Sequence, residues 1–237
     1  MFKELFIEDE GGKPAGTMEI ARTPLNKARE YAQKIFKEAG YNLNKELPDF
    51  DNNYIKAQKR AKLGHTKRNQ MPVITSRDVE LFKKRLEQGY IDIRDPRSNI
   101  KIGTGPFPDG LKGEEAKQWL QNGLKKFDGS TKDDKITIKE KNIEVDELKP
   151  IQEQMYFDKV IKKRAQEGGK KSLDFIRSSY LITSSDHYIL DGNHRFLSAM
   201  LSDPATKVNI LAIDLPIKTL LPMMLSYSDA IGNTRNK

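Results

Sequence analysis

The fold of this chain is decided by the stretch Tyr188-Ile189-Leu190-Asp191-Gly192-Asn193-His194-Arg195-Phe196-Leu197-Ser198-Ala199. Apolar residues at 180–183 and 188–190, separated by a polar turn at 184–186, predict two buried strands. After the second of them, Phe196, Leu197 and Met200 recur at helical spacing. Gly192 is therefore expected at the point where a strand passes into a helix.

A strand–glycine–helix junction is suited to binding an anion. The first amides of a helix have no partner within the helix and lie at the positive end of its dipole. Glycine lets the backbone approach a phosphate closely. His194 and Arg195 add hydrogen-bond donors, and the carboxylate of Asp191 could hold Mg²⁺. Asp-Gly is also an ordinary tight turn, so the spacing alone leaves open a helix that only caps itself.

Three motifs carry a resemblance to a known superfamily. Asp191-Gly192-Asn193-His194-Arg195 resembles the Asp-Gly-His-His-Arg signature of the ParB/sulfiredoxin superfamily, with Asn193 in place of the first histidine. The stretch 143–152 resembles that superfamily's opening strand and its proline-containing loop. Together with Met71-Pro72-Val73-Ile74, these motifs are similar to phage-encoded proteins described as ParB-like nucleases. The resemblance covers residues 70–237.

The resemblance implies an α/β (α+β) domain with a small mixed sheet that binds nucleotide phosphates at Gly192, Asn193, His194 and Arg195. Members of the superfamily differ in chemistry: sulfiredoxins use ATP, ParB proteins hydrolyse CTP, one branch phosphorylates free serine, and some members are reported nucleases. The chain has no cysteine, which excludes sulfiredoxin chemistry, disulfides and thiolate metal sites. The implied cofactors are ATP or another nucleotide with Mg²⁺.

The proline-containing loop supplies two further candidates. Pro150 would present Gln152 as a phosphate ligand and Glu153 beside it. The serine-kinase branch has a catalytic carboxylate in this region, and Glu153 is the nearest one here. With Asp191 and His194 it completes the predicted catalytic set. Alternatively, Glu153 only begins a helix over 155–165, where an acidic residue suits the dipole.

The composition favours a polyanionic partner. The net charge is +8 and the pI is about 9.4. Between positions 55 and 70 there are six basic residues and no acidic one, which is a candidate nucleic-acid arm or a solvated helix face: Lys56, Lys59, Arg60, Lys62, Lys67 and Arg68. No apolar run reaches the ~20 residues that cross a bilayer. We therefore expect no membrane association and a cytoplasmic protein, in the bacterial host if it is phage-encoded.

The order of predicted elements suggests two parts. Residues 1–70 form a basic, helical N-terminal extension with helices at 24–39 and 51–63, packed either on the rest of the chain or on a partner. Residues 71–237 form the ParB/sulfiredoxin-like domain, with its core at 136–226. Strands are also expected at 90–93, 136–139, 143–145 and 208–213, helices at 75–88, 113–127 and from 216 onward, and flexible loops at 94–112 and 168–171.

The leading functional hypothesis is a Mg²⁺-dependent enzyme of phosphoryl chemistry that hydrolyses a nucleotide or transfers its phosphoryl group. The alternatives are a ParB-like DNA nuclease, a nucleotide-gated DNA-binding protein without catalysis, or a domain that has lost its chemistry. The partners expected are a nucleotide and, in some of these hypotheses, DNA.

Overall fold

The computed structural model describes residues 18–93, 110–124 and 134–233. They form a mixed α/β fold around a five-stranded sheet of order β1-β5-β3-β4-β2. The strands are β1 (Ile138–Glu144), β2 (Lys149–Pro150), β3 (Tyr180–Ser184), β4 (Tyr188–Asp191) and β5 (Lys207–Ile213). β1–β5 and β3–β4 are antiparallel, while β5–β3 and β4–β2 are parallel. The predicted mixed-sheet α/β class is confirmed.

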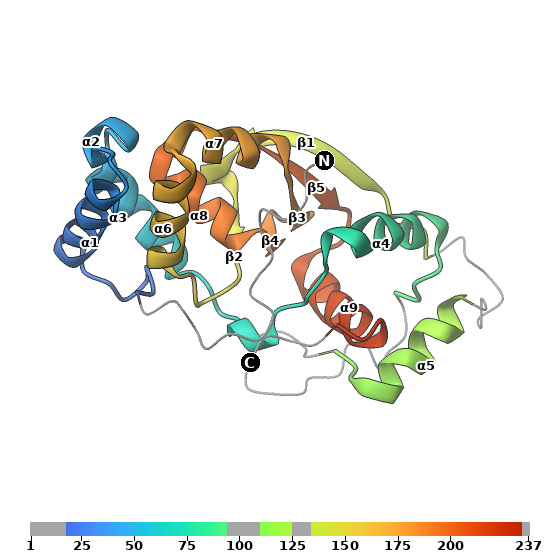
Figure 1. The fold of residues 1–237 in the computed structure, drawn as a ribbon. Helices are drawn as coiled ribbons and strands as arrows, with labels where there is room; N and C mark the ends of the chain where they lie inside the picture. The colour runs from blue at the N-terminus through green and yellow to red at the C-terminus, as the bar shows by residue number, and fades with distance from the viewer. Residues whose placement is uncertain (1–17, 94–109, 125–133, 234–237) are drawn as a thin grey trace.

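Helices cover both faces of the sheet (Figure 1). One face packs on α1 (Leu25–Glu38), α2 (Leu43–Glu46), α3 (Phe50–Ala61), α6 (Phe157–Glu167), α7 (Gly169–Ser178) and α8 (Asn193–Ser202). The other packs on α4 (Ser76–Gln88), α5 (Gly113–Leu124) and α9 (Ile217–Ala230). Successive strand residues point to opposite faces, so Leu181 and Ile189 join the first core while Ile182 and Leu190 join the second. Short 3₁₀ turns lie at Arg68–Gln70 and Val145–Glu147.

The N-terminal helices pack on the rest of the chain. α1 contacts α6, and α3 contacts both α1 and α8. The ring of Tyr54 on α3 meets that of Phe157 edge-on at 5.3 Å, and the Tyr54 hydroxyl donates to the carbonyl of Thr23 at 2.8 Å. Of the two placements left open by the sequence, packing on the chain's own α/β body is the one observed. The boundary at residue 70 stays a prediction.

Three local predictions are wrong. Residues 90–93 form no strand, because Ile91 is buried in the second core and the carbonyl of Asp92 accepts from Trp119 Nε1. The two strands expected at 136–139 and 143–145 are one edge strand, β1, which pairs with β5 along its whole length although its middle is polar and exposed. The basic stretch 168–171 is the start of α7, with Gly168 as its N-cap.

Other predicted elements are confirmed within a few residues, including the capping box of Thr75 and Asp78 on α4. Trp119 is buried in the core. The loop predicted at 94–112 lies almost wholly outside the described residues. No helix in the described ranges is long and apolar enough to cross a membrane.

Candidate functional site

The junction between β4 and α8 has the predicted geometry. β4 ends at Asp191, Gly192 is the N-cap with φ 98° and ψ 20°, and α8 begins at Asn193. This left-handed backbone favours glycine. A Cβ on Gly192 would lie 2.9 Å from Leu181 Cγ and 3.1 Å from Arg195 Nη2. The left-handed backbone and the lack of room for a Cβ therefore both require glycine at position 192.

The N-terminus of α8 places the positive end of the helix dipole directly after Gly192. No side chain among the described residues forms a cap hydrogen bond there, and the first turn of α8 contains no acidic residue. The side-chain Oδ1 of Asn193, the first helical residue, is buried and has no hydrogen-bond partner within the described structure. A buried acceptor without a donor is uncommon in a folded protein. The junction thus combines the N-terminal end of a helix with an unsatisfied side-chain acceptor.

Arg195 is fixed against the end of the sheet. Its Nη2 lies 2.6 Å from Asp191 Oδ2, and its Nη1 donates to the carbonyl of Tyr180 at 2.8 Å. The pair joins a residue at the end of β4 to one in the first turn of α8. It holds the guanidinium in one orientation beside Gly192.

His194 is held in one tautomer by a backbone amide. The N–H of Tyr156 donates to His194 Nε2 at 3.2 Å, and the two rings are stacked at 6.2 Å with an interplanar angle of 17°. Because Nε2 accepts, the proton of the neutral ring is on Nδ1. Burial, with the nearby cations of Arg68 and Lys159, lowers the pKa of His194 to about 3. The imidazole is therefore neutral at neutral pH and suited to donating from Nδ1.

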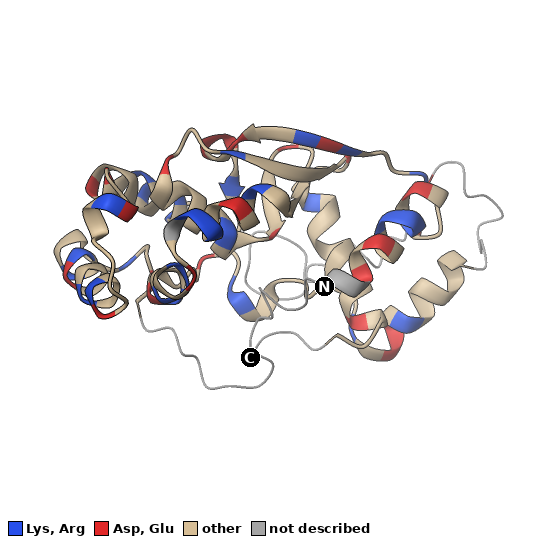
Figure 2. Cartoon of the chain, turned by 45° about the horizontal axis from the view of Figure 1, so that its top comes forward, with Lys and Arg blue, Asp and Glu red and all other residues tan. Residues whose placement is uncertain are grey.

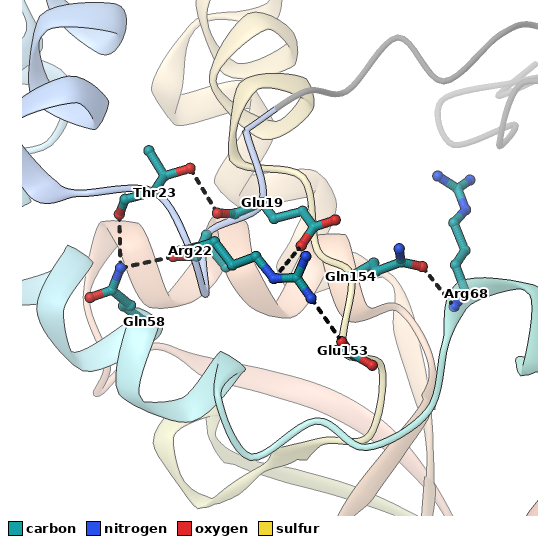
Figure 3. A network of polar contacts seen from close by, with 8 residues as sticks. Glu19, Arg22, Thr23, Gln58, Arg68, Glu153 and Gln154 are labelled. Carbon is teal, nitrogen blue, oxygen red and sulfur yellow. Dashed lines mark hydrogen bonds and ion pairs between the residues drawn. The ribbon is translucent and has the colours of Figure 1, made fainter. Parts of the chain in front are cut away.

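The loop that contains Tyr156 is hydrogen-bonded on two sides to the N-terminal part of the chain. On one side Ile20 N donates to Met155 O at 3.0 Å and Phe157 N donates to Met18 O at 2.8 Å. Arg22 Nη2 reaches across to Glu153 Oε1 at 3.2 Å (Figure 3). These contacts align residues 18–22 beside the loop in an antiparallel arrangement.

On the other side, the segment after α3 runs parallel to the same loop. Glu153 N donates to Thr66 O at 2.9 Å. Arg68 N donates to Gln154 Oε1 at 3.2 Å (Figure 3). Gly64 permits this approach, since a Cβ there would lie 2.5 Å from the carbonyl oxygen of Gln152. The N-terminal extension therefore shapes the surroundings of His194.

Two predicted site residues lie in this loop, and within the described structure their side chains bond to partners other than the motif. Gln152 is buried, and its side-chain amide donates to the carbonyl of Gln154. The carboxylate of Glu153 is half-exposed and paired with Arg22. Their roles as phosphate ligand and general base stay predictions.

The six basic residues predicted as a nucleic-acid arm have different environments in the structure. Arg60 is ion-paired with Asp146 at 3.1 Å. The guanidinium of Arg68 lies 5.8 Å from the centre of the Tyr156 ring, beside His194. The remaining four are exposed: Lys56, Lys59, Lys62 and Lys67. One member of the predicted arm thus belongs to the candidate site.

Sequence reasoning missed the contribution of α6. Lys159 Nζ lies 5.6 Å from the centre of the Tyr156 ring. Partial burial lowers the pKa of Lys163; Glu167 opposes this effect and Arg195 adds to it. Tyr156, Lys159 and Lys163 recur at i, i+3 and i+7, so the helical period could have placed them on one face. What the period could not show is that this face meets α8.

The described residues contain no group of three or more histidine, aspartate or glutamate side chains that could hold a metal ion. Asp191 is the carboxylate of the motif, and its Oδ2 is engaged by Arg195. Protein side chains alone therefore do not fit a resident Mg²⁺ at Asp191.

No protein family, curated protein or solved structure significantly matches this chain. The likeness to the ParB/sulfiredoxin superfamily therefore remains a hypothesis drawn from the motifs.

Proposed function

We propose that this chain binds the phosphates of a nucleotide at the N-terminus of α8 and carries out phosphoryl chemistry there. The observation that carries the proposal is the uncapped helix start behind Gly192, where a side chain on the N-cap would obstruct close approach. The predicted ParB/sulfiredoxin likeness points to the same residues.

The surrounding side chains suit an anionic ligand. Arg68 and Lys159 lie close enough to His194 to depress its pKa, and Lys163 lies close enough to Arg195 to be affected by its charge. The neutral His194 would donate from Nδ1 to a phosphate oxygen, and Arg195 would offset charge on the phosphoryl group. Asp158, Asp191 and Glu167 moderate this positive field.

In the catalytic part of the proposal, Glu153 accepts a proton from an attacking water or hydroxyl. The new bond forms at the terminal phosphorus, and the bond to the bridging oxygen breaks with the leaving nucleotide taking the electron pair. Arg22 would have to release Glu153, or share it, for the carboxylate to act as a base. We route no step through Mg²⁺, because the side chains at the motif do not form a metal site by themselves.

Isothermal titration tests the binding step. ATP, ADP and CTP are titrated, each with and without Mg²⁺, into the wild type, Arg195→Ala, Arg195→Lys and Arg177→Ala. Arg177 is an exposed arginine on α7 and gives the matched loss of charge. We expect saturable binding that Arg195→Ala weakens at least about tenfold, that Arg195→Lys partly restores, and that Arg177→Ala leaves unchanged. Absence of binding by every nucleotide would refute the proposal.

Turnover is tested separately by measuring phosphate release and phosphoryl transfer to small hydroxyl compounds. Glu153→Gln should retain nucleotide binding and lose turnover. Arg22→Gln, which removes the partner of that carboxylate, should retain both. If Glu153→Gln turns over nucleotide at the wild-type rate, Glu153 is not the base.

A further inference from the structure

The outer side of α3 is a basic surface. At about 100° per residue, its exposed positions fall within an arc of about 120°, on the side away from the core. The exposed residues along this arc are Asn52, Ile55, Lys56 and Lys59, and the arc is continued beyond the end of the helix by Lys62, its C-cap, and Leu63. The opposite arc is buried and contains Phe50, Asn53, Tyr54, Ala57 and Ala61. One side of α3 therefore packs on the rest of the protein, and the other side exposes lysine side chains.

The charge on this outer arc has a single sign. Lys56, Lys59 and Lys62 are exposed and form no salt bridge within the described structure, and no acidic residue occurs between positions 52 and 70. The nearest acid on the helix, Asp51, is paired with Arg29 at 2.6 Å. Both signs occur on helices elsewhere in the molecule (Figure 2). The lysine arc of α3, comprising Lys56, Lys59 and Lys62, is a local positive field.

The lysine arc sits on a rigid support. Asn53 Nδ2 donates to the carbonyl of Ser202 at 3.0 Å, which ties α3 to the end of α8. Gln58 Nε2 donates to the carbonyls of Ile20 and Thr23 at 2.9 and 2.8 Å. Little backbone ordering would therefore be needed when a partner binds.

We propose that the lysine arc of α3 binds the phosphate backbone of duplex DNA without sequence preference. At a rise of about 1.5 Å per residue, Lys56 and Lys62 are about 9 Å apart along the helix axis. Phosphates of one strand follow at about 3.4 Å along the duplex axis, so the arc spans two to three of them. Lysine contacts the backbone as a point charge and reads no base pattern, which is why binding should be indifferent to sequence.

Other partners fit the surface less well. Lysine is depleted from protein–protein interfaces, whose centres are rich in aromatic residues and arginine. A membrane-surface helix needs a continuous apolar face, and this arc has only Ile55 and Leu63. Single-stranded nucleic acid is held by stacking on aromatic side chains, and the outer arc of α3 has none.

The inference is independent of nucleotide binding, although the two surfaces are joined by the chain. After Lys62 the backbone runs past exposed Lys67 to Arg68, which lies beside Tyr156 at the candidate site. DNA bound on α3 would therefore approach the motif along this segment. A variant that loses DNA binding and retains nucleotide binding, or the reverse, therefore separates the two proposals.

The test uses the full chain, fluorescently labelled duplexes of two unrelated sequences, and a single strand of the same length. The variant carries Lys56→Gln, Lys59→Gln and Lys62→Gln. The control carries Lys27→Gln, Lys34→Gln and Lys37→Gln on α1, which removes the same charge from exposed lysines that are interspersed with Glu30 and Glu38. Circular dichroism and urea unfolding establish that each variant is folded.

We expect the wild type to bind both duplexes equally, with an affinity that falls steeply from about 50 mM to about 200 mM salt. The α3 variant should lose about 2.7 units from the slope of log K against log salt, at about 0.9 for each of the removed charges, and at least about 100-fold in affinity at about 0.1 M salt. The α1 variant should lose less than about threefold. The proposal is overturned by no duplex binding in the wild type, by equal losses in the two variants, by tighter binding of the single strand, or by strong discrimination between the duplexes.

Discussion

The neutral state of His194 predicts a specific loss of stability in acid. In the folded protein, burial and the cations of Arg68 and Lys159 lower the pKa of His194 from 6.5 to about 3. The unfolded chain therefore takes up a proton below about pH 6.5 that the folded protein does not accept until about pH 3. The contribution of this group to stability is intact above that window and is lost progressively as the pH falls through it.

The magnitude follows from proton linkage. Within the window, each pH unit costs about 1.4 kcal/mol, so the free energy of unfolding should fall by about 2.5 kcal/mol between about pH 7.5 and about pH 4.5 from His194 alone. The result changes little if the folded pKa is anywhere below about 4. Carboxylates add their own pH dependence, so the comparison has to be made against a variant that lacks the imidazole.

His194→Gln provides that comparison, because a glutamine side-chain oxygen can accept the amide hydrogen of Tyr156 in place of Nε2. Urea unfolding followed by the fluorescence of the single tryptophan, Trp119, measures stability at each pH. The wild type should lose about 2.5 kcal/mol more than the variant over this pH range. His65→Gln, at an exposed histidine, should follow the wild-type curve. Wild-type and His194→Gln curves that stay parallel would refute the assignment of an imidazole whose pKa is lowered by folding.

Three further predictions concern the packing around the site. Gly192→Ala should destabilise the protein by about 2 kcal/mol or more in urea unfolding, since it forces a left-handed alanine against Leu181; wild-type stability would show that the junction relaxes. Gly64→Ala should displace the loop at Gln152 and change the ¹H–¹⁵N signal of Tyr156, and an unchanged spectrum would contradict that contact. Arg164→Ala should lower the free energy of unfolding by about 3 kcal/mol or more, because the buried guanidinium joins α6 to Ser198 on α8. Arg164→Met should lower the free energy of unfolding by less. Equal losses in the two variants would show that the charge of Arg164, rather than the space it fills, is what matters.

Local sequence signals determined much of the fold and the centre of the site. Short apolar runs separated by a polar turn placed β3 and β4, and the helical period placed α1, α8 and α9, because each signal depends on which residues of one element are buried. The position of Gly192 between a strand and a helix followed from the same patterns. The polar middle of β1 gave no alternating signal, so only its pairing with β5 reveals it as one strand.

Only the tertiary structure decided what surrounds the motif. Arg68, Tyr156 and Lys159 meet at His194 because the extension and α6 pack beside α8, and no local pattern records which helices become neighbours. The state of His194 was likewise invisible in the sequence, since a pKa depends on burial and on charges brought near by folding. Sequence fixes which faces are apolar and where a backbone turns, through short-range sterics and hydration. Electrostatics at the site depends on distances between segments far apart in the chain, and those distances exist only once the helices have packed on the sheet.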